Sequence, residues 1–275
     1  MLKRIVFGLL AGSIVIISIL FLPKFVCNIL AVLLAIGGTY EFIKAMEKGG
    51  YRPLKAIPYA TCCGLFFVNE NISILLYKFS FSIFSFLILG ILIYGLFSTK
   101  RTLVDVSLSI FGILYIPFLL SFILSTYYAD NIGTYLIWFI LFGACLSDAF
   151  AYFVGVNFGK HKLCPQISPK KSIEGAVGAI VGTAIVFFIY AYVLNKYYAF
   201  DIQYWQIVLF GAISSVFAQI GDLVASSIKR FVGEKDFGSF LPGHGGVLDR
   251  IDSILFVAPV IYYGVLMFES LITLK

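Results

Sequence analysis

Residues 5–22 read IVFGLLAGSIVIISILFL and contain no charged side chain. As a helix, a run of this length can cross the apolar core of a bilayer, which is about 30 Å thick. The whole chain of 275 residues is 61% hydrophobic and 12% charged, with a mean hydropathy of +1.00. Soluble domains do not reach these values, so the run predicts the first span of an integral membrane protein. Because no small-residue cleavage site follows at residues 22–24, we do not interpret it as a removable signal peptide.

Apolar windows bounded by charged or turn residues predict nine spans along the chain. Only helices satisfy their own backbone groups in lipid at this length, so the predicted fold is an all-α, polytopic integral membrane helix bundle. We expect about five spans in an N-terminal region, 1–130, and the others in a C-terminal catalytic region, 131–275, with no soluble domain and no internal repeat. The predicted spans are 5–22, 25–46, 55–69, 80–98, 104–126, 133–157, 172–193, 204–229 and 251–272.

Lysine and arginine are distributed unevenly between alternate loops. Sixteen of the 20 lie on one predicted side of the membrane and four on the other. The positive-inside rule places the richer side in the cytoplasm, together with the N-terminus and the long loops 158–171 and 230–250. We therefore expect a multi-pass protein of the cell (inner) membrane. Because topology also explains the net charge of +6, we expect no nucleic-acid partner.

Acidic residues inside predicted spans mark a candidate site. A helix places Asp222, Ser226 and Lys229 on one face, because they are spaced i, i+4 and i+7. Asp148 lies in the span 133–157, and we expect its partner to be a base of the same pocket. A carboxylate in a membrane helix is costly and usually faces a polar cavity or a partner. Both acids are therefore functional candidates, and a structural ion pair between helices is the alternative for Asp222.

The loop 233–250 combines glycines with charged residues of both signs. Its four glycines between positions 238 and 246 would let the backbone approach a ligand and turn N–H groups toward an anion. Asp249 and Asp252 are expected in the first turn of the last span, where acids also suit the helix dipole. A purely structural role of these acids at the helix dipole does not explain the bases that converge on the loop. Carboxylates and bases together suit a metal-bound polyphosphate; the bases are Lys229, Arg230, Lys235, His244 and Arg250.

A second cytoplasmic segment, Ser168-Pro169-Lys170-Lys171, precedes the span 172–193. We interpret Ser168 as an N-cap and Pro169 as the first helical residue. Two lysines in a first helical turn oppose the helix dipole unless an anion binds there, so the segment predicts a phosphate site. The alternative is that both lysines are only positive-inside anchors.

The stretch from Ser226 to Asp252 resembles the signature of the phosphatidate cytidylyltransferase (CDP-diacylglycerol synthase) family. The matching residues are Ser226-x-Ile228-Lys229-Arg230, then Lys235-Asp236-x-Gly238, then Leu241-Pro242-x-His244-Gly245-Gly246-Val247-x-Asp249-Arg250-Ile251-Asp252. No residue departs from the signature. Residues 148–153 and 168–172 resemble two further segments of the family, whereas the N-terminal spans match only in character.

The resemblance implies an enzyme that converts CTP and phosphatidate to CDP-diacylglycerol and pyrophosphate with Mg²⁺. It implies Asp222 and Asp249 as metal ligands, and these two residues with Lys229, Arg230 and Arg250 as the catalytic set. A second cation, monovalent or divalent, and a homodimer are left open. The residues expected to bind substrate are Ser168, Lys170, Lys171, Ser226, Lys235, Asp236, His244, Gly245, Gly246, Asp148 and Asp252. His244 could instead brace the glycine loop, and Asp252 could support the metal ligands.

Three other classes of membrane protein also carry charged residues of this kind. A relative that uses another lipid phosphate or another nucleotide stays open, because nothing in the apolar spans identifies acyl chains. A secondary transporter would use Asp148 and Asp222 for ion coupling, but transporters bury their sites between repeated halves near the midplane. Here the charges crowd into loops at one predicted face. A CDP-alcohol phosphotransferase is excluded, since its DGxxAR-type helix motif is absent.

Overall fold

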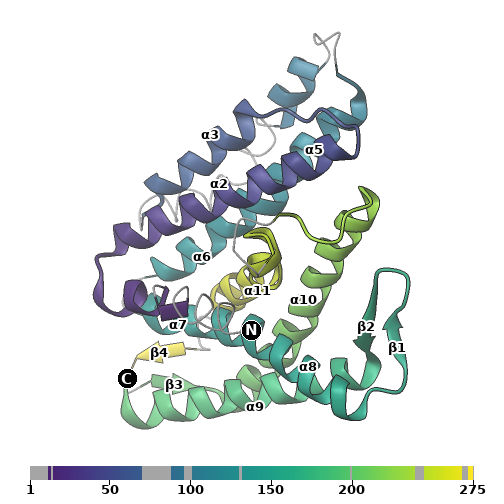
Figure 1. The fold of residues 1–275 in the computed structure, drawn as a ribbon. Coiled ribbons are helices and arrows are strands. Elements are labelled where there is room, and N and C mark those ends of the chain that lie inside the picture. Colours follow the sequence, from purple (N-terminus) through teal and green to yellow (C-terminus); the bar gives the residue numbers. More distant parts are fainter. Residues whose placement is uncertain are drawn as a thin grey trace. The chain divides into compact units, whose positions relative to one another are not determined.

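The computed structural model describes residues 12–13, 15–69, 88–95, 101–129, 132–198, 200–238, 245–267 and 272–274 (Figure 1). Helices dominate this part of the chain, as predicted. They are α2 (Lys24–Lys48), α3 (Ala56–Gly64), η1 (Leu65–Phe67), α5 (Leu103–Ile113), η2 (Leu114–Phe118), α6 (Leu119–Tyr127), α7 (Gly133–Leu141), η4 (Phe142–Leu146), α8 (Ser147–Phe158), α9 (Ile173–Tyr197), α10 (Tyr204–Phe231) and α11 (Leu248–Met267). Two small antiparallel pairs join β1 (Lys162–Cys164) to β2 (Ser168–Ser172) and β3 (Phe200–Ile202) to β4 (Ile272–Leu274).

Five helical segments are long and apolar enough to cross a membrane, which confirms the all-α membrane fold. Each corresponds to one predicted span, and its ends lie within four residues of the predicted ends. The described parts of the spans 5–22 and 80–98 are helical at 15–21 and 88–95, and the remainder of both lies outside the described residues. The five segments are Lys24–Lys48, Leu103–Tyr127, Gly133–Phe158, Ile173–Tyr197 and Tyr204–Phe231.

The predicted span 55–69 differs from the structure. Its helix covers only Ala56–Phe67, which is roughly 18 Å at 1.5 Å per residue and too short for a full crossing. The Asn28 side chain explains how the helix can end early: its Nδ2 donates to the carbonyls of Phe66 (2.9 Å) and Val68 (2.7 Å). A neighbouring helix thus satisfies backbone carbonyls that a longer helix would satisfy itself.

The chain divides into two compact units, one formed by Met1–Thr134 with Lys229–Arg250 and the other by Tyr135–Ile228 with Ile251–Lys275. In the first unit α2 lies against α3, α5, η2 and α6 (Figure 1). Phe42 and Met46 of α2 are each 1% exposed and anchor this core. A capping box between Thr102 and Asp105 begins α5, and Asp105 also accepts the N–H of Arg52 at 2.6 Å. These contacts fix the start of the α5–α6 crossing.

Two π-helical turns lie inside the long crossings. The turn η2 contains Pro117 and joins α5 to α6, and η4 joins α7 to α8. Proline lacks a backbone N–H and clashes with the preceding turn of an ordinary helix. A single π turn accommodates such a residue without ending the helix. This accounts for η2, and both crossings continue through their π turn as single helical segments, as the hydropathy predicted.

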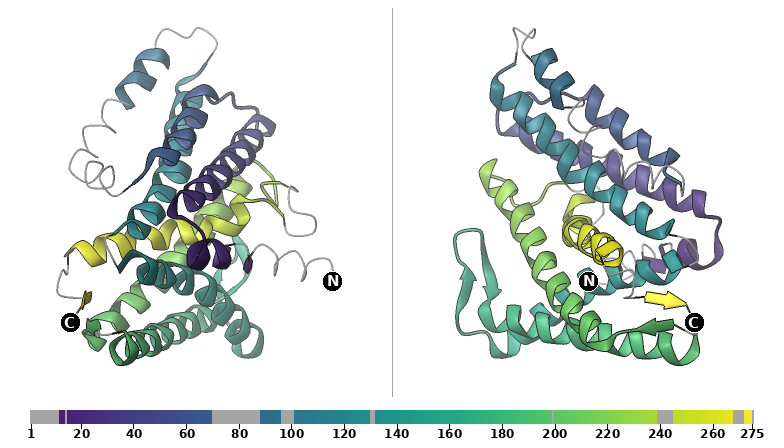
Figure 2. Two further views of the ribbon diagram at one scale, coloured as in Figure 1. Left: turned by 90° about the vertical axis from the view of Figure 1, so that its left-hand side faces the viewer. Right: turned by 180° about the vertical axis from the view of Figure 1, so that it is seen from behind.

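In the second unit α8 and α9 pack closely side by side (Figures 1 and 2). Glycines of α9 permit this approach: a Cβ atom at Gly178 or Gly182 would collide with the side chain of Val154 or Phe150, respectively. Small residues at such positions let membrane helices gain dispersion contacts that lipid does not provide. The pair of helices is the base from which the β1–β2 hairpin extends.

Gly182→Ala is expected to lower the stability of the protein by about 1–3 kcal/mol, because the added methyl group overlaps the Phe150 ring. Gly64→Ala is the matched control, since a Cβ atom there meets nothing within 4 Å. Alanine normally stabilises a helix by up to about 1 kcal/mol relative to glycine. Thermal unfolding in detergent checks that Gly182→Ala lowers the unfolding midpoint, whereas Gly64→Ala does not. Equal midpoints would show that the α8–α9 contact tolerates an added methyl group.

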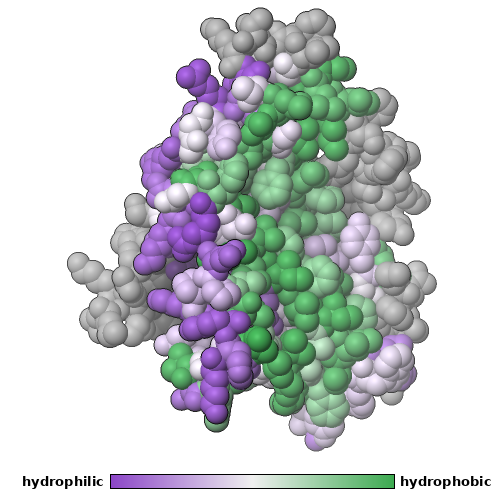
Figure 3. Space-filling view, turned by 90° about the vertical axis from the view of Figure 1, so that its right-hand side faces the viewer, coloured by the Kyte–Doolittle hydropathy of each residue, from purple (hydrophilic) through white to green (hydrophobic). Residues whose placement is uncertain are grey.

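Apolar side chains also cover much of the face shown in Figure 3. On α9 they form a regular stripe with an interval of four residues. Each of these four side chains is more than half exposed: Val177, Val181, Ile185 and Ile189. A helix that presents such a stripe outward is suited to contact with lipid acyl chains.

Candidate functional site

The segment that contains Ser168 is a strand, and the predicted helix start is wrong. Residues 168–172 form β2 and pair with β1, and α9 begins at Ile173 with Ser172 as its N-cap. The Ser172 hydroxyl accepts the N–H of Gly175 at 3.2 Å. Cross-strand hydrogen bonds with β1 satisfy the backbone that an earlier helix would have used. Lys170 and Lys171 therefore lie on a hairpin and not in a helical first turn.

Lys171 and Asp222 form an ion pair in the second unit. The Lys171 Nζ lies 2.7 Å from Asp222 Oδ2, and these side chains are 18% and 32% exposed. Lys171 also donates to the carbonyl of Gln219 at 3.4 Å, and the Ser226 hydroxyl donates to Asp222 Oδ1 at 3.4 Å. We name Lys171, Asp222 and Ser226 the hairpin cluster. The hairpin cluster joins the segment 168–171 to the span 204–229. Lys170 is exposed and is not part of the cluster.

Asp148 accepts a hydrogen bond from a hydroxyl group, and the base Lys171 interacts with it electrostatically. The Ser253 Oγ donates to Asp148 Oδ2 at 3.0 Å. Asp252, which is 7% exposed, accepts the N–H of Ser253 at 2.7 Å. Because α11 begins at Leu248, Asp252 lies beyond its first turn and only Asp249 lies within it. The prediction that both acids occupy the first turn was wrong for Asp252, since the helix starts three residues earlier than expected.

Asp249 organises the charged loop of the first unit. Its Oδ1 lies 2.6 Å from Lys229 Nζ, with side chains 8% and 11% exposed. Its Oδ2 accepts the N–H groups of Phe237 (3.1 Å) and Gly246 (3.0 Å). We name Lys229, Phe237, Gly246 and Asp249 the loop cluster. Gly245 has φ +77°, a conformation that favours glycine. The N–H of Gly246 is thus directed at a carboxylate of the protein and not at a bound anion.

The other predicted residues of this loop lie at its surface. Four are exposed: Arg230, Lys235, Asp236 and Arg250. Arg230 Nη1 donates to the carbonyl of Glu234 at 3.1 Å. His244 lies outside the described residues. The loop therefore presents bases around a buried lysine–aspartate pair, which is the charge arrangement that a phosphate ligand requires.

Sequence reasoning missed Glu41, a residue of α2 that is 2% exposed. Its Oε2 accepts the N–H of Leu248, the first residue of α11, at 2.9 Å. The signal was available, because Glu41 is an acid within the predicted span 25–46 and deserved the same interpretation as Asp148 and Asp222. It was overlooked because the resemblance to known proteins was confined to the C-terminal half.

Comparison with known proteins identifies the family. A model of the cytidylyltransferase family matches residues 2–268. The chain belongs to the cytidylyltransferase family. It is 40% identical over 152 residues to the phosphatidate cytidylyltransferase of Thermotoga maritima, covering 55% of this chain and 56% of that protein. It is 44% identical over 133 residues to the phosphatidate cytidylyltransferase of Bacillus subtilis, covering 47% and 48%. The matches thus span about half the length of these relatives.

The contacts of the Asp222 and Asp249 carboxylates show what room they leave for a divalent cation. Among the described residues, no three His, Cys, Asp or Glu side chains gather into a metal-binding group. Mg²⁺ usually takes only one or two protein carboxylates and completes its shell with water and phosphate oxygens. A carboxylate has about four lone-pair positions. Asp249 uses three and Asp222 two in the contacts described above. Both acids therefore have capacity left for a hard cation.

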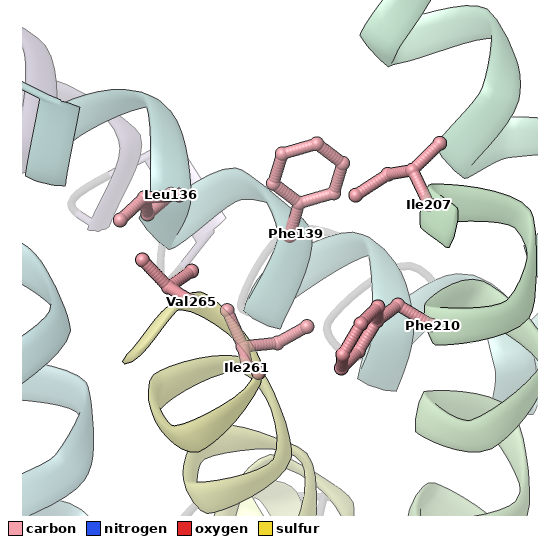
Figure 4. Close-up of a pocket in the computed structure, with 7 residues that line it drawn as sticks. Leu136, Phe139, Ile207, Phe210, Ile261 and Val265 are labelled. Atoms are coloured by element: carbon pink, nitrogen blue, oxygen red, sulfur yellow. The ribbon is translucent and has the colours of Figure 1, made fainter. Parts of the chain in front are cut away.

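A small cavity in the second unit is a poor candidate for the substrate site of this family. It holds about 20 Å³ and is lined by apolar side chains of α7, α10 and α11 (Figure 4). A space of this size takes roughly one water molecule. Its labelled lining residues are Leu136, Phe139, Ile207, Phe210, Ile261 and Val265. Nothing in the lining could orient a nucleotide, so the charged clusters are the better candidates.

Proposed function

We propose that this protein transfers the cytidylyl group of CTP to phosphatidate, forming CDP-diacylglycerol and pyrophosphate in phospholipid biosynthesis. The family match over residues 2–268 carries the proposal. Relatives named phosphatidate cytidylyltransferase, 40–46% identical over their matched parts, indicate the acceptor. We place the protein in the cell (inner) membrane as a multi-pass protein, with its N-terminus and both charged loops in the cytoplasm, where CTP is available.

In this reaction the nucleophile is a phosphate oxygen of phosphatidate. It attacks the α-phosphorus of CTP, a new P–O bond forms, and the bond from the α-phosphorus to the bridging oxygen of the β-phosphate breaks. Pyrophosphate leaves with that electron pair. The attacking oxygen is ionised near neutral pH, so little general-base catalysis is needed. The main barrier is repulsion between two anions, which positioning and charge neutralisation reduce.

The bases of the two clusters can provide that neutralisation. Lys229 and Lys171 are each held by an aspartate at 2.6 and 2.7 Å, respectively. Their positions are therefore fixed before substrates arrive, which lowers the entropy cost of binding phosphate. The exposed Arg230, Lys235 and Arg250 add mobile positive charge around the loop cluster. We assign these bases to the triphosphate and to the phosphatidate head group.

The acids supply the cation site in this proposal. We assign Mg²⁺ to Asp222 and Asp249, whose remaining lone pairs suit a hard cation. When bound there, Mg²⁺ would withdraw charge from the α-phosphate and stabilise the leaving pyrophosphate. Asp148 and Asp252, linked through Ser253, support substrate or metal contacts from the second unit. Asp236, Ser226, Ser168, Gly245 and His244 complete the proposed substrate contacts.

The proposal is tested by incubating the purified protein with CTP, phosphatidate and Mg²⁺. We expect stoichiometric pyrophosphate and CDP-diacylglycerol, and no product after chelation of divalent cations with EDTA. A transporter would release no pyrophosphate. Parallel reactions with other nucleoside triphosphates and with ether-linked phosphatidate determine the substrate class. Product formed only with a different lipid or nucleotide would replace the proposed substrates.

A further inference from the structure

Glu41 places a carboxylate from the N-terminal helix α2 directly beneath the loop cluster. It is 2% exposed, and its Oε1 has no hydrogen-bond partner among the described residues. A buried carboxylate costs several kcal/mol unless its contacts compensate. The carboxylate accepts the N–H of Leu248 at 2.9 Å, 207 positions away in the sequence, and is also in hydrogen-bond contact with the backbone of Val247. An apolar side chain of the same size could not accept the N–H of Leu248.

The contact with Leu248 fixes the start of α11. The first N–H groups of a helix have no partner within the helix, and Glu41 satisfies one of them from another segment. Asp249 is the next residue in the chain and points its own carboxylate at Lys229 and at the N–H of Gly246. A shift of Leu248 would therefore move the aspartate that organises the loop cluster.

Glu41 also explains two glycines of the loop. A Cβ atom at Gly238 would lie 2.6 Å from Glu41 Oε1, and one at Gly246 would overlap Glu41 Oε2. Both loop segments thus pass directly over the carboxylate. A side chain at 238 or 246 would push on the buried Glu41 carboxylate, so these glycines serve close packing on the protein itself, where the sequence had suggested close approach to a ligand. Glu41 and Asp249 together hold the loop from below and from its helical end.

We propose that Glu41 is a positioning residue that fixes Asp249 for cation binding through its hydrogen bond to Leu248 and its contact with both glycines. This inference rests on the proposed function, since it assigns Asp249 to the metal. The role belongs to the acceptor oxygen and the shape of the side chain. Glutamine has the same shape and keeps an acceptor oxygen, whereas alanine removes both. The Glu41→Gln and Glu41→Ala variants therefore separate positioning from other effects.

The test measures Mn²⁺ binding by electron paramagnetic resonance on purified protein, with Mn²⁺ as the probe for Mg²⁺. Glu41→Ala should weaken Mn²⁺ binding about 10-fold or more, the usual effect of losing a support behind a metal ligand. It should also raise the Mg²⁺ concentration needed for half-maximal activity. Glu41→Gln should remain within about threefold of the wild type. Gly238→Ala adds a methyl group that pushes on Glu41 Oε1, so it should weaken Mn²⁺ binding in the same way. This second variant keeps the test valid if Glu41→Ala does not fold.

Two variants of α2 serve as controls. Glu47→Ala makes the same change at a side chain that is 42% exposed and paired with Lys55. Thr39→Val disturbs a fully buried hydroxyl in contact with Cys62. Both should leave Mn²⁺ binding unchanged, even if Thr39→Val lowers the unfolding temperature. A structural role for Glu41 would instead lower stability without changing cation affinity.

Three results would overturn the inference: unchanged Mn²⁺ binding in Glu41→Ala, equal losses in the Gln and Ala variants, or equal losses in Thr39→Val. Equal losses in Gln and Ala would assign the effect to charge rather than to position. The proposed function fails separately. If the wild type makes no CDP-diacylglycerol, the proposed function is wrong. If Glu41→Ala nevertheless weakens Mn²⁺ binding, Glu41 keeps its positioning role, in a protein that catalyses another reaction.

Discussion

Asp249→Asn is expected to lower turnover by about 1,000-fold or more while the protein stays folded in the membrane. Asp249 holds three donors: Lys229 at 2.6 Å and the N–H groups of Phe237 and Gly246. An asparagine keeps one acceptor oxygen and turns an NH₂ group toward the remaining donors. The substitution thus removes a proposed metal ligand and the anchor of Lys229 together. Losing one such electrostatic element typically costs about 100–1,000-fold, and here two are lost.

Pyrophosphate release from CTP and phosphatidate measures this effect, and circular dichroism checks that the helices are retained. Asp201→Asn is the matched control, because Asp201 is an exposed carboxylate of β3. It should keep full activity. An Asp249→Asn protein that stays active at ordinary Mg²⁺ concentrations would remove Asp249 from the metal site. The loop cluster would then be a structural feature only.

The helix bundle could be predicted from the sequence because the hydropathy of each segment decides whether that segment can cross a membrane. A helix in lipid must be apolar along its whole length, so apolar windows locate its ends. The span predicted at 104–126 is the helix Leu103–Tyr127, and 133–157 is Gly133–Phe158. The exception at 55–69 has a non-local cause. Asn28, in another helix, satisfies the carbonyls that allow Ala56–Phe67 to end early.

The hairpin was not predictable by the same reasoning. Ser168-Pro169 has the residues of a helix start, but so does Ser172, and the choice depends on backbone pairing with β1. Local capping chemistry could have favoured Ser172, because Glu174 then lies in the first turn and suits the helix dipole. The predicted helix start at Ser168 instead put Lys170 and Lys171 in the first turn, where positive charge opposes the helix dipole. This unfavourable electrostatic interaction was a sign that the predicted helix boundary was wrong.

The sequence proposes residues for the candidate site but does not predict how they pair. Acids and bases at unusual positions were identified because charge is costly in apolar segments. The pairs Lys171–Asp222 and Lys229–Asp249 join residues far apart in the chain, and one sequence carries no direct information on such contacts. Glu41 is the extreme case, since its partner Leu248 is near the other end of the chain. The shared metal at Asp222 and Asp249 stays a prediction.

Lys171→Ala should reduce kcat/KM by about 10–100-fold, whereas Lys170→Ala should stay within about threefold of the wild type. The sequence treated the two lysines as equivalent, but only Lys171 is held by an aspartate, with its side chain 18% exposed. A charge-assisted hydrogen bond to phosphate contributes about 1.5–3 kcal/mol, and that sets the expected range. Lys171→Ala should raise KM for CTP or phosphatidate, because a contact to phosphate is lost. It should also lower kcat, because Lys171 neutralises Asp222.

A double-substitution cycle separates the two roles of Lys171. In an Asp222→Asn background the aspartate no longer needs a cation, so Lys171→Ala should cost less than it does alone. Lys170→Ala should cost the same in both backgrounds and serves as the matched control. Equal losses in the two single variants would contradict the distinction between Lys171 and Lys170. KM values for CTP and phosphatidate that stay unchanged in both variants would mean that the lysines only anchor the hairpin at the membrane surface. A full additive loss would instead show that Lys171 acts on substrate independently of Asp222, since a residue that works through its partner has little left to lose once that partner is gone.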